Sequence, residues 1–280
     1  MSHSDHTEAK AIPFLKWAGG KRWLTYGYPE LFPDKYERYY EPFLGSGAAF
    51  FSLRPKNATL ADINRELIDC YVAVRDEWSK VQNHLVNHHK AHSKEHYYKI
   101  RQLMPADLAE KAARFIYLNR TCWNALYRVN LQGVFNVPMG TKANVVLDTD
   151  NFEQVSKLLK GVTITNLDFE EVINQAQKGD LIFADPPYTV KHNFNGFVKY
   201  NEKIFHWDDQ VRLSECLIKA SDRGCLVFLT NANHPSIISL YENDFHLTPL
   251  KRRSVIAASS NNRGMYDELV IQNFSNGLIT

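Results

Sequence analysis

The feature that most constrains the fold of this chain is an alternation of short apolar runs with longer helical patterns. Three segments have the composition of strands and end at polar or glycine-rich turns, at residues 38–42, 58–62 and 180–184. A fourth run, at 225–229, follows an amphipathic helical pattern over 208–221. Because helices between parallel strands cover both faces of a sheet, the alternation predicts an α/β fold with a mostly parallel, Rossmann-like sheet.

A basic stretch interrupts this alternation. From Lys90 to Lys142 there are nine Lys or Arg residues against three acids, a net charge of +6 in a chain that carries +2. Apolar residues at near-helical spacing over 107–119 predict a helix with one buried face, and alternating apolar residues around Gln132-Gly133 predict a β-hairpin over 126–138. Such a block is a candidate nucleic-acid footprint, although a solvated basic face has the same composition.

Length and composition suit a core domain with an insertion. The chain has 280 residues, of which 44% are hydrophobic and 23% charged, as in ordinary globular proteins. We expect a flexible tail over 1–11, a discontinuous catalytic core made of 12–75 and 150–280, and an inserted domain over 76–149. The sequence has no apolar run near the roughly 18 residues that span a bilayer and no signal-peptide core, so we expect no membrane contact.

Cysteine and histidine positions argue against a metal site. The cysteines show no CxxC pair, which predicts buried thiols in a reducing cytoplasm for Cys70, Cys122, Cys216 and Cys225. Five histidines share one polar segment without a carboxylate cluster, so we interpret them as a solvated helix face; they are His84, His88, His89, His92 and His96. We expect a mechanism that needs no metal.

The tetrapeptide Asp185-Pro186-Pro187-Tyr188 follows a predicted strand. Two prolines keep the backbone extended, so the carboxylate and the adjacent carbonyl point in fixed directions, and the tyrosine ring can stack on a planar group. This arrangement suits an aromatic amine, because acceptors for both N–H groups favour a pyramidal nitrogen whose lone pair is free to attack. Taken alone, the tetrapeptide is equally compatible with a plain turn.

A glycine-rich loop follows the first predicted strand. The segment 41–47, EPFLGSG, lets the backbone approach a ligand at the start of a helix, but it lacks the GxGxxG spacing of dinucleotide-binding proteins. Asp62 stands 15 residues after Gly47, at the end of the next strand, where a carboxylate can accept hydrogen bonds from ribose hydroxyls. Asp168 could bind an adenine amine of the same cofactor or could cap a helix.

Six motifs together resemble one family. FLKWAGGK at 14–21, EPFLGSG at 41–47, ADIN at 61–64, FIYLNRTCWNALYRVN at 115–130, FNVP at 135–138 and DPPY at 185–188 occur in the order of the Dam-type adenine-N6 DNA methyltransferases. The resemblance extends from about Pro13 to Phe274. It implies the S-adenosylmethionine-dependent methyltransferase fold with an inserted target-recognition domain, and methyl transfer to N6 of a flipped-out adenine in duplex DNA.

The resemblance also implies a role for individual residues. It assigns the grip on the flipped adenine to Asp185, the Pro186 carbonyl and Tyr188. It assigns contacts with S-adenosylmethionine to Trp17, Lys21, Phe43, Gly45, Ser46, Gly47, Asp62, Asp168, Phe169 and Asp185. It assigns contacts with double-stranded DNA to Lys16, Trp123, Asn124, Leu126, Arg128, Pro138 and Lys142. We expect a monomer in the cytoplasm of a bacterium or a phage-infected cell.

Among the DNA contacts, Arg128 resembles the bidentate reader of a guanine, and Lys16 resembles the lysine that reaches the first guanine. Leu126 and Pro138 match positions that touch thymine methyl groups, although ordinary hairpin packing is an alternative. Trp123 matches the aromatic residue that fills the gap left by the flipped base. This set of residues is associated with the tetranucleotide GATC.

The chain departs from the family pattern at two places and retains a basic segment near its C-terminus. After FNVP the family often has Phe-Gly-Arg, whereas Met139-Gly140-Thr141 follows here, so a phosphate contact is missing or has moved to Lys142. Residues 192–205 differ from the better-known members and are expected to form a separate DNA-contacting loop. The basic residues 251–253, with the segment 259–263, suit phosphate groups.

Three other functions remain open from the sequence. One is methylation of cytosine N4, for which the pocket usually has serine in place of Asp185. The second is adenine methylation in structured RNA, and the third is DNA binding without catalysis.

Overall fold

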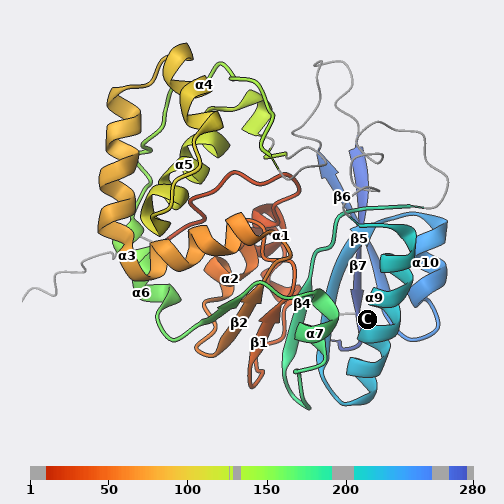
Figure 1. Ribbon diagram of the computed structural model, residues 1–280. Helices are drawn as coiled ribbons and strands as arrows, with labels where there is room; N and C mark the ends of the chain where they lie inside the picture. The colour runs from red at the N-terminus through yellow and green to blue at the C-terminus, as the bar shows by residue number, and fades with distance from the viewer. Residues whose placement is uncertain (1–10, 126, 129–133, 191–204, 254–264, 276–280) are drawn as a thin grey trace, which may run out of the picture. The chain divides into compact units, whose positions relative to one another are not determined.

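The computed structural model describes residues 11–125, 127–128, 134–190, 205–253 and 265–275 (Figure 1). The chain forms two compact units. Unit 1 comprises Met1–Gly27, Gly45–Lys56 and Asn64–Asn166, and unit 2 comprises Tyr28–Leu44, Asn57–Ile63 and Leu167–Thr280. Within the described ranges, no helix combines the length and the apolar character that crossing a membrane requires.

Unit 2 contains a mostly parallel sheet in the order β2-β1-β4-β5-β7-β6. Parallel pairing joins β2 (Ala58–Ala61), β1 (Tyr39–Glu41), β4 (Leu181–Ala184) and β5 (Leu226–Ala232). The last two strands, β7 (Met265–Gln272) and β6 (His246–Arg253), form an antiparallel pair at one edge, and β7 is antiparallel to β5. All four residues of the central strand β4 are buried, as expected for a parallel strand covered on both faces.

Among its described residues, unit 2 has three helices and one short turn beside this sheet. They are α7 (Phe169–Ile173), α9 (Trp207–Asp222), α10 (Pro235–Tyr241) and the 3₁₀ turn η1 (Pro29–Leu31). Leu213, Leu217 and Ala220 recur at helical spacing along α9 and are fully buried in the same core cluster as Val227 and Leu229 of β5. The apolar stripe of α9 therefore holds the helix against the sheet.

Unit 1 is mainly helical. Its elements are α1 (Arg22–Gly27), α2 (Ala48–Leu53), α3 (Arg65–Lys90), α4 (Lys94–Gln102), α5 (Leu108–Thr121), η2 (Trp123–Ala125), α6 (Phe152–Leu159) and β3 (Thr163–Thr165). Side-chain caps start the long helices: Asn64 accepts a hydrogen bond from the Leu67 N–H, and Asp107 accepts one from the Glu110 N–H. Figure 1 shows α3 and α5 packed side by side in this unit, which their extensive contacts also indicate.

The four predicted strands of the sheet are present, and Asp168 caps a helix, but α5 differs from its prediction. We expected one buried face, whereas all residues from Ala112 to Thr121 are buried. The reason lies in unit 1 itself. The ring of Phe115 contacts Trp17 and Tyr127, while the Arg120 guanidinium pairs with the Asp150 carboxylate at 2.6 Å. The helix is thus enclosed by neighbours that its own periodicity does not reveal.

The proposed boundary of the inserted domain, between residues 75 and 76, falls inside α3. That helix is interrupted at the adjoining residue Glu77, which has non-helical angles (φ −134°, ψ 32°). The division into core and recognition domain stays a prediction.

Several predicted features lie outside the described residues. They are most of the tail at 1–11, Leu126, the centre of the hairpin at 129–133, residues 192–204 of the expected loop and the segment 259–263.

Candidate active site

The DPPY tetrapeptide begins where β4 ends, in the middle of the unit 2 sheet. Ala184, the last residue of β4, pairs with Leu229 of β5. β5 continues beyond that point, so Thr230 lies beside Asp185, and its hydroxyl donates a hydrogen bond to Asp185 Oδ1 at 2.8 Å. Ligands of open α/β sheets bind at the carboxyl ends of such strands, which is where this carboxylate lies.

Tyr188 is held by a second carboxylate. Its hydroxyl donates to Glu268 Oε2 at 3.1 Å, and Glu268 is positioned by its pairing with Ala232 across β5 and β7. Burial, followed by the Asp185 and Glu268 carboxylates, raises the pKa of Tyr188 well above its usual value. The hydroxyl therefore stays protonated and remains a donor. With the hydroxyl engaged, the part of Tyr188 that can contact a base is its ring face.

The backbone of the tetrapeptide is attached to α9 through Gln210. This side chain is fully buried, its Nε2 donates to the Pro187 carbonyl at 3.2 Å, and its Oε1 accepts a hydrogen bond from Asn231 Nδ2 at 3.0 Å. One amide thus links the turn after β4 to β5. Because a buried amide left without partners is costly, this link restricts the turn to one arrangement.

Phe43 and Asp62 follow the carboxyl ends of the two neighbouring strands. Glu41 pairs with Leu60, and the Leu44 N–H donates to the Ala61 carbonyl at 2.9 Å, which keeps the two chain segments together beyond the sheet. The ring of Phe43 stacks on Phe169, with centroids 5.5 Å apart. The strand ends therefore bring two predicted cofactor residues to the same edge as Asp185.

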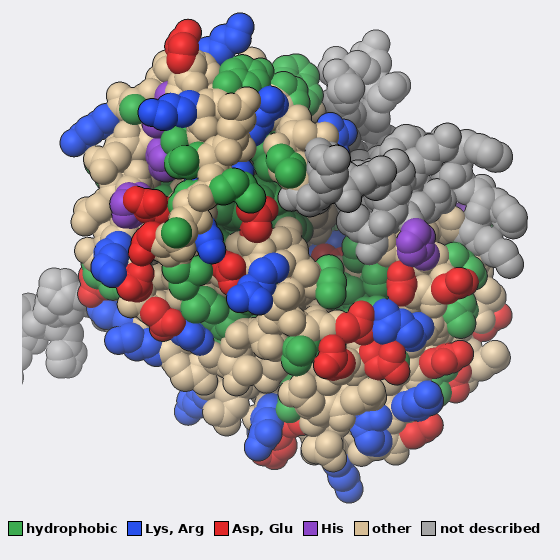
Figure 2. Space-filling model, in the orientation of Figure 1, with side chains coloured by type: hydrophobic (Ala, Val, Ile, Leu, Met, Phe, Trp, Pro, Cys, Tyr) green, Lys and Arg blue, Asp and Glu red, His purple; other side chains and the backbone are tan. Residues whose placement is uncertain are grey.

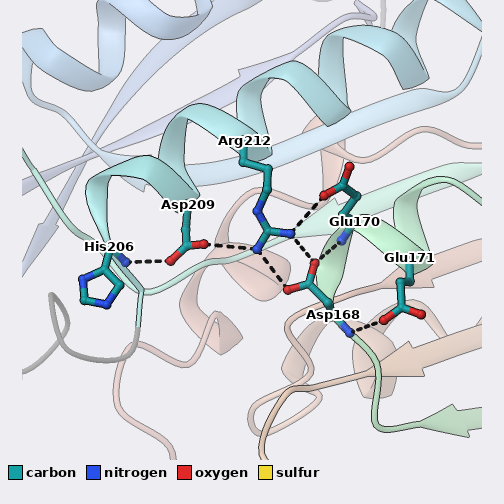
Figure 3. Close-up of polar contacts among 6 residues, drawn as sticks. All are labelled: Asp168, Glu170, Glu171, His206, Asp209 and Arg212. Carbon is teal, nitrogen blue, oxygen red and sulfur yellow. Dashed lines mark hydrogen bonds and ion pairs between the residues drawn. The ribbon is translucent and has the colours of Figure 1, made fainter.

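Asp168 has the capping role that the sequence left open. Its Oδ1 accepts a hydrogen bond from the Glu170 N–H at 3.0 Å at the start of α7. The same carboxylate is paired with Arg212, which also contacts Glu170 and Asp209 (Figure 3). Burial alone would raise the pKa of Asp168, but the hydrogen bonds from Arg212 and from the Glu170 N–H outweigh it, so the pKa is lowered.

The remaining predicted cofactor residues lie together in unit 1. Gly45 and Gly47 have φ of +47° and +65°, angles that favour glycine. A Cβ on Gly45 would lie 2.8 Å from Trp17 Cδ1, so no other residue fits this approach of the loop to the indole. Lys21 Nζ donates to the Gly19 carbonyl at 2.8 Å. The predicted set thus forms one group in each unit.

Lys16 and Lys142, two predicted DNA contacts, are neighbours in unit 1. The main chain of Lys16 is anchored on both sides by Asn119, which accepts from the Lys16 N–H at 2.9 Å and donates to the Lys16 carbonyl at 2.7 Å. Burial, followed by repulsion from Lys142 and Arg120, lowers the pKa of Lys16. Neighbouring cations that repel each other are suited to bind a polyanion, because the negative charges of the polyanion relieve the repulsion.

The other predicted DNA contacts that the structure describes lie on two facing segments of unit 1. The Trp123 N–H donates to the Pro138 carbonyl at 2.9 Å, and the Asn136 N–H donates to the Arg128 carbonyl at 3.4 Å. The Trp123 side chain is 53% exposed, a high value for an indole. Asn124 adopts φ of +54°, which asparagine tolerates better than most residues. The pairing supports the predicted hairpin in its described part.

The histidine segment is less solvated than predicted. His88 Nδ1 lies 3.1 Å from His96 Nε2, and His92 Nδ1 lies 2.9 Å from the Tyr117 hydroxyl, so three of the five rings gather around one tyrosine. Figure 2 shows histidine side chains reaching the surface of the molecule, yet burial, followed by repulsion from His96 and His84, lowers the pKa of His88 to about 4. Sequence spacing did not reveal this packing.

Among the described residues, no group of three or more His, Cys, Asp or Glu is arranged to hold a metal ion. The four cysteines are buried as free thiols, as expected.

Four side chains that hold the site were not found from the sequence: Thr230, Glu268, Gln210 and Arg212. The available signal was weak. Thr230 and Asn231 are polar residues at the end of an apolar run, at the same edge as DPPY, and could have been selected on that ground. Nothing in the local sequence marks Glu268 or Arg212, since their partners lie 80 and 44 residues away.

The carboxyl edge of the α/β sheet thus holds an anchored carboxylate, Asp185, close in the chain to a tethered aromatic residue, Tyr188, the combination that the sequence linked to an aromatic amine. The D12 class N6 adenine-specific DNA methyltransferase model matches residues 17–256. The chain belongs to this family and is an enzyme that methylates adenine N6 in DNA. Membership decides in favour of adenine over cytosine, DNA over RNA, and catalysis over binding alone.

Curated relatives align over nearly the whole chain. The type II methyltransferase M1.LlaDCHI of Lactococcus lactis subsp. cremoris is 36% identical over 94% of this chain and 96% of its own length. The type II methyltransferase M.MjaIII of Methanocaldococcus jannaschii is 34% identical over 94% of this chain and 99% of its own length. A DNA adenine methylase of Vibrio cholerae is 30% identical over 93% and 95% of the two chains.

Proposed function

We propose that this chain transfers the methyl group of S-adenosylmethionine to N6 of an adenine flipped out of duplex DNA, within a site related to GATC. The observation that carries the proposal is that both functional side chains of the DPPY tetrapeptide are held in place by hydrogen bonds. The Asp185 carboxylate is held by Thr230 and the Tyr188 hydroxyl by Glu268. Such an arrangement is preorganised for one planar amine.

In this reaction the side chains of the protein orient the target base and its amine. Asp185 and the Pro186 carbonyl accept hydrogen bonds from the two N–H groups of the target amine, which turns the nitrogen lone pair toward the methyl group. Tyr188 stacks on the base and keeps it in place, because its hydroxyl is already engaged by Glu268. The sulfonium of the bound cofactor supplies an already activated methyl group. The flipped position excludes neighbouring bases from the pocket.

The chemistry of the available side chains suits this cofactor. Asp62 follows a strand end and offers a carboxylate for ribose hydroxyls, and Asp168 offers one for an adenine amine. Phe169, stacked on Phe43, offers an apolar surface for a purine. In unit 1, Trp17 and the Gly45–Gly47 loop make a close-packed turn that brings backbone N–H groups to the start of α2. Carboxylates that accept hydrogen bonds from hydroxyl and amine groups, beside a stacked aromatic pair, suit a nucleoside.

DNA contact by unit 1 is supported by charge and exposure. Lys16 and Lys142 form a local concentration of positive charge, and Trp123 offers an exposed ring of the kind that fills an emptied base position. Arg128, on the facing segment, carries the guanidinium that would read a guanine.

The test compares the wild type with Asp185→Ala. Both proteins are incubated with labelled S-adenosylmethionine and duplex DNA, and the modified nucleoside is identified after digestion; long-read sequencing of DNA from an expressing host gives the sequence context. We expect N6-methyladenine with the wild type and none with the variant, while cofactor affinity changes by no more than a few-fold. Methylation by the variant above a few per cent of the wild-type rate would remove Asp185 from its role.

A further inference from the structure

Arg212 of α9 forms a bidentate ion pair with Asp168 through the two terminal nitrogens of its guanidinium. Nη1 lies 2.6 Å from Oδ1 and Nη2 lies 3.0 Å from Oδ2, the two-point geometry that an arginine forms with a carboxylate (Figure 3). Two further acids complete the set, since Arg212 donates to Glu170 Oε2 at 3.0 Å and to Asp209 Oδ1 at 3.1 Å. One cation thus orders three carboxylates.

The same guanidinium lies against the aromatic residue next to Asp168. Its Cζ is 4.0 Å from the centroid of the Phe169 ring, a cation–π contact. Phe169 in turn stacks on Phe43. Arg212 therefore sets the position of two consecutive residues, a carboxylate and a ring, and both belong to the proposed site for the cofactor base.

These bonds leave Asp168 little remaining capacity. An ionised carboxylate accepts hydrogen bonds at about four lone-pair positions. Oδ1 already accepts from Arg212 and from the Glu170 N–H at 3.0 Å, and Oδ2 accepts from Arg212. The capping box at the start of α7 also brings the Glu171 N–H to this carboxylate. The capacity that remains is small, and it can only accept. A group that binds there must bring a hydrogen, as an amine does and as a carbonyl oxygen cannot.

We propose that Arg212 is a positioning residue that makes the cofactor pocket select a purine with a 6-amino group over one with a 6-oxo group. The inference rests on the proposed function, in which Asp168 contacts the base of S-adenosylmethionine. Arg212 keeps the carboxylate an acceptor and aims its remaining lone pair. Without Arg212, three neighbouring carboxylates lose their shared cation, and Asp168 can take up a proton and donate to a 6-oxo group.

The chain offers variants that separate charge from geometry. Arg212→Met removes both the positive charge and the bidentate hydrogen bonds to Asp168. Arg212→Lys keeps the charge but cannot form the bidentate hydrogen bonds. Lys219→Met is the matched control, because it removes an exposed cation from the same helix, and the Lys219 side chain makes no hydrogen bond or ion pair among the described residues.

The experiment measures dissociation constants by titration calorimetry for S-adenosylhomocysteine and its deaminated analogue, S-inosylhomocysteine, at pH 5.5 and 7.5. We expect the wild type and Lys219→Met to prefer the adenosyl compound by about 10-fold or more, the effect of one charge-assisted hydrogen bond. Arg212→Met should reduce the preference to within about 3-fold, most strongly at pH 5.5, and Arg212→Lys should give an intermediate ratio.

The outcomes distinguish this inference from the proposed function. If the wild type does not bind S-adenosylhomocysteine, the proposed cofactor is wrong. If it binds with preference and Arg212→Met keeps that preference at both pH values, Arg212 has no positioning role. Should Arg212→Met fail to fold, Asp168→Asn replaces it, because an amide can donate as well as accept and should also lose the preference. Asp62→Ala, a ribose variant, should weaken both compounds equally.

Discussion

Replacing Thr230 with valine tests whether the anchoring of Asp185 matters for catalysis. The substitution keeps the shape and the β-branched character of the side chain within β5, and it removes only the hydroxyl that donates to Asp185 Oδ1 at 2.8 Å. Thr230 is fully buried, so no bulk water takes the place of the hydroxyl. The carboxylate loses one fixed donor and gains freedom to turn away from the target amine.

The magnitude is worked from the bond to Asp185, which at 2.8 Å is shorter than the 3.5 Å bond from the same hydroxyl to the Ala184 carbonyl. A hydrogen bond to a charged group contributes about 1.5–3 kcal/mol. At 1.36 kcal/mol for each tenfold change in rate, losing it from the transition state lowers kcat by about 10- to 150-fold. The dissociation constant of the cofactor should stay within about twofold, since Thr230 does not hold the other cofactor residues of unit 2, which are Phe43, Asp62, Asp168 and Phe169.

The assay is single-turnover methylation of a duplex with saturating cofactor, alongside calorimetry for cofactor binding. Thr248→Val is the matched control: it makes the same chemical change in β6, where the Thr248 hydroxyl bonds to no polar group within the described part of the chain. A Thr230→Val enzyme as fast as Thr248→Val would refute the view that a fixed Asp185 carboxylate contributes to the rate.

Three further results are expected. Asp62→Ala should weaken S-adenosylmethionine binding by about 1.5–3 kcal/mol through the loss of charge-assisted hydrogen bonds, and unchanged affinity in calorimetry would point to another ribose partner. Arg128→Ala should remove about 1–3 kcal/mol of discrimination at one base position and so relax specificity there. Lys142→Ala should instead weaken binding to all sequences and flatten its salt dependence. If Arg128→Ala lowered activity equally at every site, Arg128 would be a phosphate contact. Because folding lowers the pKa of His88 to about 4, below its unfolded value near 6.5, the stability that depends on neutral His88 is present above pH 6.5 and is lost as the pH falls toward 4. Urea titrations should show a decline on the order of 1–2 kcal/mol, reduced in His88→Gln, and an equal decline in that variant would contradict the assignment.

The sequence by itself determined the class of fold and the chemistry. The short apolar runs at 58–61 and 181–184 predict buried strands, and asparagine at position 64 is a preferred residue for a helix start, because these signals act between neighbours in the chain. The DPPY motif likewise carries its acceptors and its ring within four residues. Such local features are visible before any folding is considered.

Only the tertiary structure decided what holds those groups. Tyr188 meets Glu268 80 residues later, Lys16 meets Asn119 103 residues later, and Asp168 meets Arg212 44 residues later. No periodicity encodes these pairs, since each depends on which strand ends and helices the sheet brings together. The same reason explains the two errors made from the sequence. The enclosure of α5 and the packing of the histidines on Tyr117 depend on partners that a helical pattern does not specify.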